Sequence, residues 1–118
     1  MALPWVRLDT QISSNPKVLM LLADSHQQAV CVYLFSLGYS GAHGTDGFIP
    51  KLALPMIHGS MADAKRLVGV GLWSSAGGGW DINGWTEFQP TSDENAERKR
   101  KAKLAAHKRW HPDEPFTE

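Results

Sequence analysis

The sequence predicts a small α+β fold followed by a basic helical extension. The order of patterns along the chain is helix, helix, short strand, helix, helix and a two-stranded hairpin, which is the order of a winged helix-turn-helix domain. Charge is segregated, because seven of the twelve lysines and arginines fall between Arg98 and Arg109, a segment without Asp or Glu. We therefore expect a winged-helix domain over residues 1–90, a basic helix over 91–111 and a disordered tail over 112–118.

The first part of the chain predicts an arm and a helix. Residues 3–8 alternate loosely and are either a short strand or an extended arm against the core. Asn15 and Pro16 favour a helix start, because Asn caps free N–H groups and Pro suits the first turn. This helix is expected to run to about Ala23. Its expected buried face consists of Val18, Leu19, Leu21 and Leu22.

A second helix is predicted from Gln27 to Leu37, with Ser25 as its cap. Because its middle is almost continuously apolar, this helix is expected to be buried on most sides. A strand is the competing prediction for this run, since Val30 and Val32 are β-branched. The four glycines of residues 38–47 predict a loop that ends the helix.

The middle of the chain predicts a strand and two helical segments. Residues 48–50 read as a short strand, and residues 51–58 as one or two helical turns interrupted by Pro55 and ended by Gly59. A further helix is predicted from Ser60 to Val70. Its inward face is expected to hold Ala64, Leu67 and Val68, and its outward face Ala62, Asp63, Lys65, Arg66 and Gly69.

A hairpin is predicted next, with Leu72-Trp73 and residues 80–82 as its strands and residues 74–79 as a flexible tip. Phe88 is expected to close the core, and Pro90 to break the chain before the last helix. The tryptophans of this region are interpreted as core and cross-strand residues.

Composition argues against several classes of protein. The lone Cys31 can form no internal disulfide, which favours a reducing compartment, and it is expected to pack as a small hydrophobe. No apolar stretch approaches the roughly 20 residues of a membrane span, and no signal peptide is evident. The five histidines are scattered, and no catalytic motif is found. The sequence therefore predicts a cytoplasmic protein without catalytic residues, metal or cofactor.

Two parts of the predicted domain are candidates for contact with DNA. The helix from Ser60 to Val70 is the candidate recognition helix, in which Ser60 can bind a phosphate and Lys65 and Arg66 can reach phosphates or base edges. In the hairpin, Ser74 and Ser75 can donate hydrogen bonds, and the three glycines permit close approach to a phosphodiester. The alternative interpretation is an ordinary solvated helix and a floppy loop.

The basic segment is the more specific signal. Residues 91–94 have the T-x-x-E form of a capping box, and alanines make the segment a strong helix former. Its bases lie on all sides of that helix and leave no apolar stripe, unlike a membrane-surface helix or a coiled coil. They are Arg98, Lys99, Arg100, Lys101, Lys103, Lys108 and Arg109. The segment fits contact with a phosphate groove, and a solvated helical tail is the alternative.

The chain also resembles the N-terminal winged-helix domains of bacteriophage and prophage replication initiators. The likeness lies in residues 46–50 (DGFIP), 64–68 (AKRLV) and 71–73 (GLW), and in the early WVRL and NPK motifs. It also includes a basic segment that ends in Arg109-Trp110. The resemblance implies double-stranded DNA binding in replication initiation or transcription regulation, in the cytoplasm of a bacterial host.

Other hypotheses stay open at the level of sequence. The domain could instead dock on a replication or host protein through its winged-helix surface, or the basic tail could bind RNA or single strands. A homodimer is also open. No membrane partner is expected.

Overall fold

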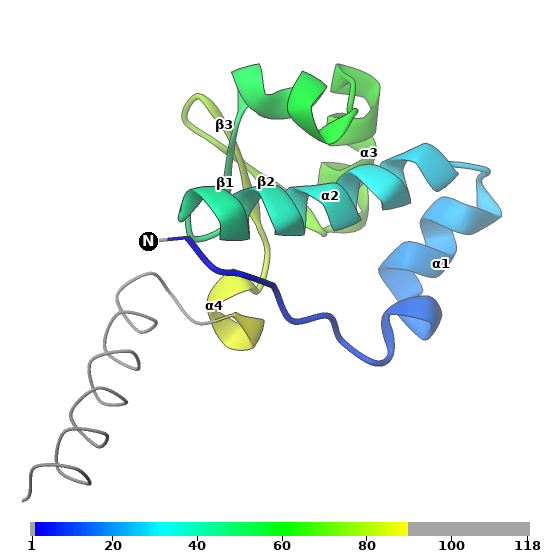
Figure 1. The fold of residues 1–118 in the computed structure, drawn as a ribbon. Helices are drawn as coiled ribbons and strands as arrows, with labels where there is room; N and C mark the ends of the chain where they lie inside the picture. The colour runs from blue at the N-terminus through cyan, green and yellow to red at the C-terminus, as the bar shows by residue number, and fades with distance from the viewer. Residues whose placement is uncertain (1, 90–118) are drawn as a thin grey trace, which may run out of the picture.

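The computed structural model describes residues 2–89, which form an α+β fold of helices and a three-stranded antiparallel sheet (Figure 1). The elements are η1 (Ile12–Ser14), α1 (Pro16–Ala23), α2 (Gln27–His43), β1 (Phe48–Pro50), η2 (Lys51–Ile57), α3 (Met61–Val70), β2 (Trp73–Ala76), β3 (Gly79–Ile82) and α4 (Trp85–Phe88), where η denotes a 3-10 helix. The predicted elements occur in the predicted order, η1 and α4 are additional, and the fold is compatible with a winged-helix arrangement. The predicted basic helix over 91–111 and the tail over 112–118 lie outside the described residues.

The N-terminal segment is an extended arm, which was one of the two structures predicted for residues 3–8; the other was a short strand. The Leu3 N–H donates to the Gly41 carbonyl of α2 at 2.7 Å. The Arg7 N–H donates to Gln89 Oε1 at 2.8 Å, and Gln89 Nε2 donates back to the Arg7 carbonyl at 2.5 Å. This reciprocal pair satisfies the buried amide of Gln89 and fastens the end of α4 to the arm.

Helix α1 begins and ends where the sequence predicted. The Asn15 side chain accepts a hydrogen bond from the Lys17 N–H at 2.9 Å, and Pro16 occupies the first turn. The expected buried face is half wrong, because Val18 and Leu21 are buried whereas Leu19 and Leu22 are exposed. A helix of eight residues packed on one side buries only a narrow stripe of its surface.

Helix α2 differs from its prediction at both ends. Ser25 has a φ of 60° and does not cap the helix. The helix also runs through the predicted glycine loop as far as His43 and ends at Gly44, which has a φ of 64°. The reason lies in packing: a Cβ at Gly41 would come within 2.5 Å of Val6 Cγ1, so this glycine serves the close contact with the arm rather than a turn.

Helix α2 is buried on one side only, so its predicted interior position is wrong. Ala29, Val32 and Leu37 are buried, while Leu34 and Phe35 are exposed. Cys31 is exposed as well, which corrects the expectation that it packs as a small hydrophobe. Helices α1 and α3, β1 and η2 all pack against α2 and leave its other side open. The apolar run indicated a helix, but it did not reveal which side is covered.

The sheet has the strand order β1-β3-β2, so β3 pairs with both of its neighbours. Residues 48–50 form the predicted strand. Ser74 and Ser75 belong to β2, opposite Asp81 and Trp80, so the tip is Gly77-Gly78 rather than the predicted residues 74–79. The segment before α3 is helical through Pro55 and ends at His58, one residue before the predicted Gly59.

The core lies between the sheet and the helices. Trp73 and Trp80 are buried with ring centroids 5.5 Å apart, as expected of cross-strand residues. Phe88 is 52% exposed and does not close the core; Trp85, which is 5% exposed, occupies that place. No helix within residues 2–89 has the length and apolar character that crossing a membrane requires.

A small cavity of about 70 Å³ lies between the arm, α2 and α4, and Tyr33 lines it. Burial, together with the charge of Asp9, raises the pKa of Tyr33 above its ordinary value of 10.0. A raised pKa means that the neutral phenol is favoured by folding. Its contribution to stability is fully present below about pH 10 and is lost as the pH rises further.

We therefore expect the free energy of unfolding to fall more steeply above about pH 10 in the wild type than in a Tyr33→Phe variant, which cannot ionise there. Urea unfolding at about pH 8 and about pH 11 measures the difference between the two proteins. An identical fall in the two would contradict the assignment of this pH dependence to Tyr33.

Candidate nucleic-acid interface

Helix α3 presents the outer face that the sequence predicted, with one exception. Ala64 and Leu67 are fully buried, and α3 packs against α1, α2 and β2. The exposed residues of α3 are Met61, Ala62, Lys65, Arg66 and Gly69. Asp63 was expected on that outer face but is only 4% exposed.

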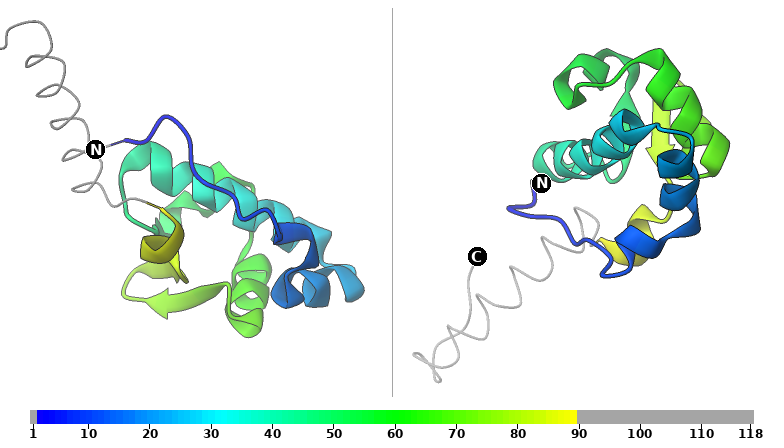
Figure 2. Two further views of the ribbon diagram at one scale, coloured as in Figure 1. Left: turned by 90° about the horizontal axis from the view of Figure 1, so that it is seen from below. Right: turned by 90° about the vertical axis from the view of Figure 1, so that its right-hand side faces the viewer.

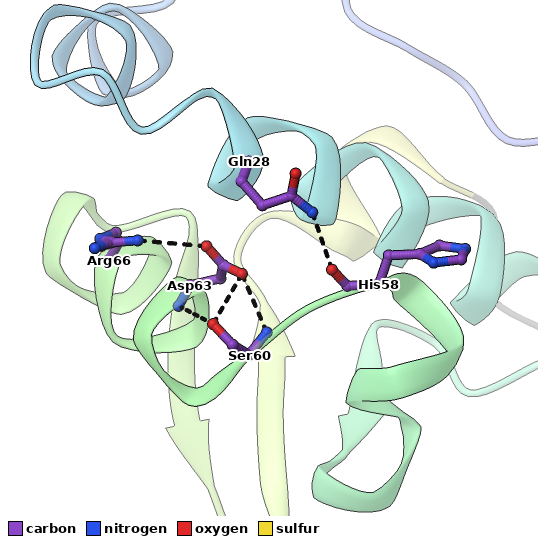
Figure 3. Close-up of polar contacts among 5 residues, drawn as sticks. All are labelled: Gln28, His58, Ser60, Asp63 and Arg66. Carbon is purple, nitrogen blue, oxygen red and sulfur yellow. Dashed lines mark hydrogen bonds and ion pairs between the residues drawn. The ribbon is translucent and has the colours of Figure 1, made fainter.

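Asp63 is buried because it completes a capping box at the start of α3 (Figure 3). The Ser60 N–H and the Ser60 hydroxyl donate to Asp63 Oδ2 at 3.1 and 3.0 Å, and the Asp63 N–H donates to Ser60 Oγ at 3.3 Å. These bonds satisfy backbone donors that the first helical turn leaves open. The S-x-x-D spacing was visible in the sequence, but the interpretation of Asp63 as a surface residue missed it.

The capping box also engages two of the predicted DNA-binding residues. The Ser60 hydroxyl is already hydrogen-bonded to a carboxylate, and its use toward a phosphate stays a prediction. Arg66 Nη1 lies 3.5 Å from Asp63 Oδ1, and the Arg66 side chain is 41% exposed. Lys65 is exposed and forms no hydrogen bond or ion pair with another described residue. Lys65 is therefore the freest cation of α3, and Arg66 is held in place by Asp63.

The turn that precedes α3 fixes the direction of the helix. His58 has a φ of 60°, and its carbonyl accepts a hydrogen bond from Gln28 Nε2 of α2 at 3.0 Å (Figure 3). A Cβ at Gly59 would lie 3.0 Å from Val32 Cγ1, so the turn packs tightly on α2. Helix α3 is thus braced by another helix while its outer face stays free.

The predicted contact residues of the hairpin have different environments. Ser74 Oγ donates to Asn83 Oδ1 at 2.5 Å, and Asn83 Nδ2 donates to the Gly71 carbonyl at 2.7 Å. Ser74 therefore joins the hairpin to the end of α3. Ser75 is exposed opposite Trp80 and has no hydrogen-bond partner through its side chain among the described residues. The exposed Asp81, opposite Ser74, adds a negative charge to the hairpin.

Two lysines that the sequence did not single out as DNA-binding residues adjoin these elements. Lys17 Nζ donates to the Gly71 carbonyl at 3.2 Å, directly after α3. The Lys51 N–H donates to the Gly78 carbonyl at 2.9 Å, which places this exposed lysine beside the hairpin tip. No local sequence pattern predicts either contact, because each contact joins residues that are far apart in the chain.

The structure thus gathers the cations of the domain around α3 and the hairpin. Of the five lysines and arginines in residues 2–89, only Arg7 belongs elsewhere, with its guanidinium at the Phe88 carbonyl of α4. Figure 2 shows α3 beside the hairpin, and α3 packs against both β2 and α2. The bases of residues 98–109 lie outside the described residues.

Within residues 2–89 no group of three or more His, Cys, Asp or Glu side chains is arranged to hold a metal ion. Comparison with protein-family models, with curated proteins and with solved structures gives no significant match, so the function has to be inferred from the residues and contacts of this chain itself.

Proposed function

We propose that this chain is a winged helix-turn-helix protein that binds double-stranded DNA in a sequence-directed way. Helix α3 would enter the major groove, the β2–β3 hairpin would lie along the neighbouring backbone, and the bases of residues 98–109 would add affinity through phosphates. The observation that carries the proposal is the placement of Lys17 and Lys51 at the end of α3 and at the hairpin tip.

This placement matters because DNA affinity comes largely from phosphate contacts, whereas base contacts supply the sequence preference. Lys51 and Lys17 are suited to phosphate contacts. Lys65 and Arg66 lie on the only face of α3 that no other described element covers, so they are suited to base contacts. Ala62 and Gly69 on the same face are small and leave room for close approach to base edges.

The biological role is proposed from the resemblance to phage and prophage replication initiators. We infer replication initiation or transcription regulation in a bacterial host cell. Docking on a replication or host protein is the second candidate, favoured by the exposed apolar side of α2, which DNA would not use.

The test uses single lysine variants of the full chain. Lys51→Gln should weaken duplex binding and reduce the magnitude of the slope of log affinity against log salt by about 1, whereas Lys65→Gln should weaken binding mainly to the preferred sequence and relax the preference for it. For Lys51, the weakening should be equal on all sequences, because a phosphate contact carries no sequence information. Fluorescence anisotropy over a salt series measures both quantities.

Arg7→Gln is the matched control, since it removes the same charge from the side that α4 occupies. Its backbone bonds to Gln89 do not involve the replaced side chain. An Arg7→Gln protein with the same change of slope as Lys51→Gln would show that net charge alone matters, which contradicts the proposed interface. A full-length protein that leaves duplex DNA unshifted at low salt and co-purifies with another protein would favour the docking role instead.

A further inference from the structure

The two oxygens of the Asp63 carboxylate have different partners at the start of α3 (Figure 3). Oδ2 accepts from the N–H and the hydroxyl of Ser60 at 3.1 and 3.0 Å, whereas Oδ1 lies 3.5 Å from Arg66 Nη1. Asp63 is buried, and the capping box holds its side chain in place. Arg66 is therefore paired with a carboxylate whose position is fixed.

Arg66 itself lies at the edge of the exposed face of α3. It is three residues after Asp63, which places the two side chains about 60° apart around the helix axis. The Arg66 side chain is partly exposed and forms no hydrogen bond with another described residue. The ion pair uses Nη1, so the other N–H donors of the guanidinium are available to a second molecule.

The ion pair makes Arg66 better suited to an uncharged base than to a phosphate. Attraction to a phosphate depends on charge, and the nearby carboxylate of Asp63 offsets the charge of Arg66. The edge of a base is uncharged and is recognised by the positions of its donors and acceptors. A guanidinium that is already held in one orientation loses less conformational entropy when it meets two acceptors at fixed positions.

Guanine is the base that offers two such acceptors. In the major groove its N7 and O6 atoms lie side by side, whereas adenine presents N7 next to an amino donor. The arginine guanidinium contains only donors, so it matches guanine and is opposed by the adenine amino group. The Asp63 carboxylate does not compete for an amino group, because it is buried and both of its oxygens have partners.

We propose that Arg66 recognises a guanine of the DNA site through N7 and O6 in the major groove, and that Asp63 is the residue that positions Arg66 for this contact. The inference rests on the proposed binding of duplex DNA through α3. It adds the base that is recognised and the pair of residues responsible.

The test starts from duplexes that the wild-type full chain selects from a random pool. Replacing each selected guanine in turn by 7-deazaguanine removes the N7 acceptor and leaves base pairing intact. At the guanine that Arg66 contacts, this replacement should weaken wild-type binding roughly tenfold. It should have no effect on Arg66→Met, which keeps the length of the side chain but has no donors. Lys65→Met is the matched control and should stay as sensitive to this replacement as the wild type.

Asp63→Asn separates the positioning of Arg66 from the folding of α3. The asparagine oxygen can still accept from Ser60, but the charge that holds Arg66 is lost. Binding to random duplexes should stay as tight as in the wild type or become a few-fold tighter, since a negative charge is removed. The effect of 7-deazaguanine should fall from roughly tenfold to about twofold or less. Circular dichroism checks that the helix content is unchanged.

The outcomes distinguish this inference from the proposed function. A wild type that binds no duplex, or selects no sequence, would overturn both. Selected sites without guanine, or equal sensitivity of Arg66→Met and the wild type to 7-deazaguanine at every guanine, would overturn this inference alone. Equal weakening of Arg66→Met on all sequences would assign Arg66 to a phosphate instead. If Asp63→Asn loses affinity for random duplexes as well, Asp63 only caps the helix and does not position Arg66.

Discussion

A full-length variant in which the seven bases between Arg98 and Arg109 are replaced by glutamine should lose roughly three to five orders of magnitude of affinity for duplex DNA at physiological salt. The reason is counterion release: five to seven phosphate contacts contribute a slope of roughly −4 to −6 to log affinity against log salt. Most of this slope should vanish in the variant. The salt series used for the lysine variants measures it.

The matched control keeps the composition of residues 98–109 and shuffles their order. Because phosphate contact depends on charge rather than on sequence, the shuffled protein should keep most of the slope. Circular dichroism checks that the domain stays folded in both proteins. An unchanged slope in the glutamine variant would support the solvated-tail interpretation and would remove the basic segment from the proposed mechanism.

Gly79→Ala should destabilise the domain by about 2–3 kcal/mol or more, whereas Gly77→Ala, two residues away, should change stability by no more than about 0.5 kcal/mol. A Cβ at Gly79 would lie 2.1 Å from the Ile49 carbonyl oxygen, which is backbone and cannot move without disturbing the pairing of β1 with β3. A Cβ at Gly77 would meet nothing within 4 Å. Urea unfolding of the two variants measures the contrast.

The two substitutions also distinguish the roles of the hairpin glycines. Gly78, between them, has a φ of 79°, so it is required by the turn itself. Should Gly77→Ala and Gly79→Ala be equally stable, the close contact between β1 and β3 would be wrong. Should Gly77→Ala instead weaken only DNA binding, the open tip would be in contact with the phosphate backbone.

Several elements could be predicted because their signals are local. Asn15 and Pro16 start α1, Ser60 starts α3, and the short strand at residues 48–50 lies where its pattern placed it. Caps and turns depend on residues within a few positions of one another, so they can be predicted from a short stretch of sequence. The same holds for the cluster of bases in residues 98–109, which is a property of composition alone.

The errors concern features that distant residues determine. The glycines of α2 predicted a loop, yet Gly41 makes room for Val6 of the arm and the helix continues. The exception is local: Asp63 was expected on the surface, but it is buried and completes a capping box with Ser60, three residues away. Periodicity predicts that a helix has a covered side, but it cannot say how much of a uniformly apolar helix is covered.

Some features of the candidate interface could likewise be predicted from the sequence, and others were found only in the structure. The sequence by itself determined the order of the elements, the outer position of Lys65 and Arg66 on α3, and the basic segment that follows the domain. Only the tertiary structure brought Lys17 to Gly71 and Lys51 to the hairpin tip, and left one apolar side of α2 exposed. The physical reason is that strand register and helix packing join residues distant in the chain, and no local propensity records which of them will meet.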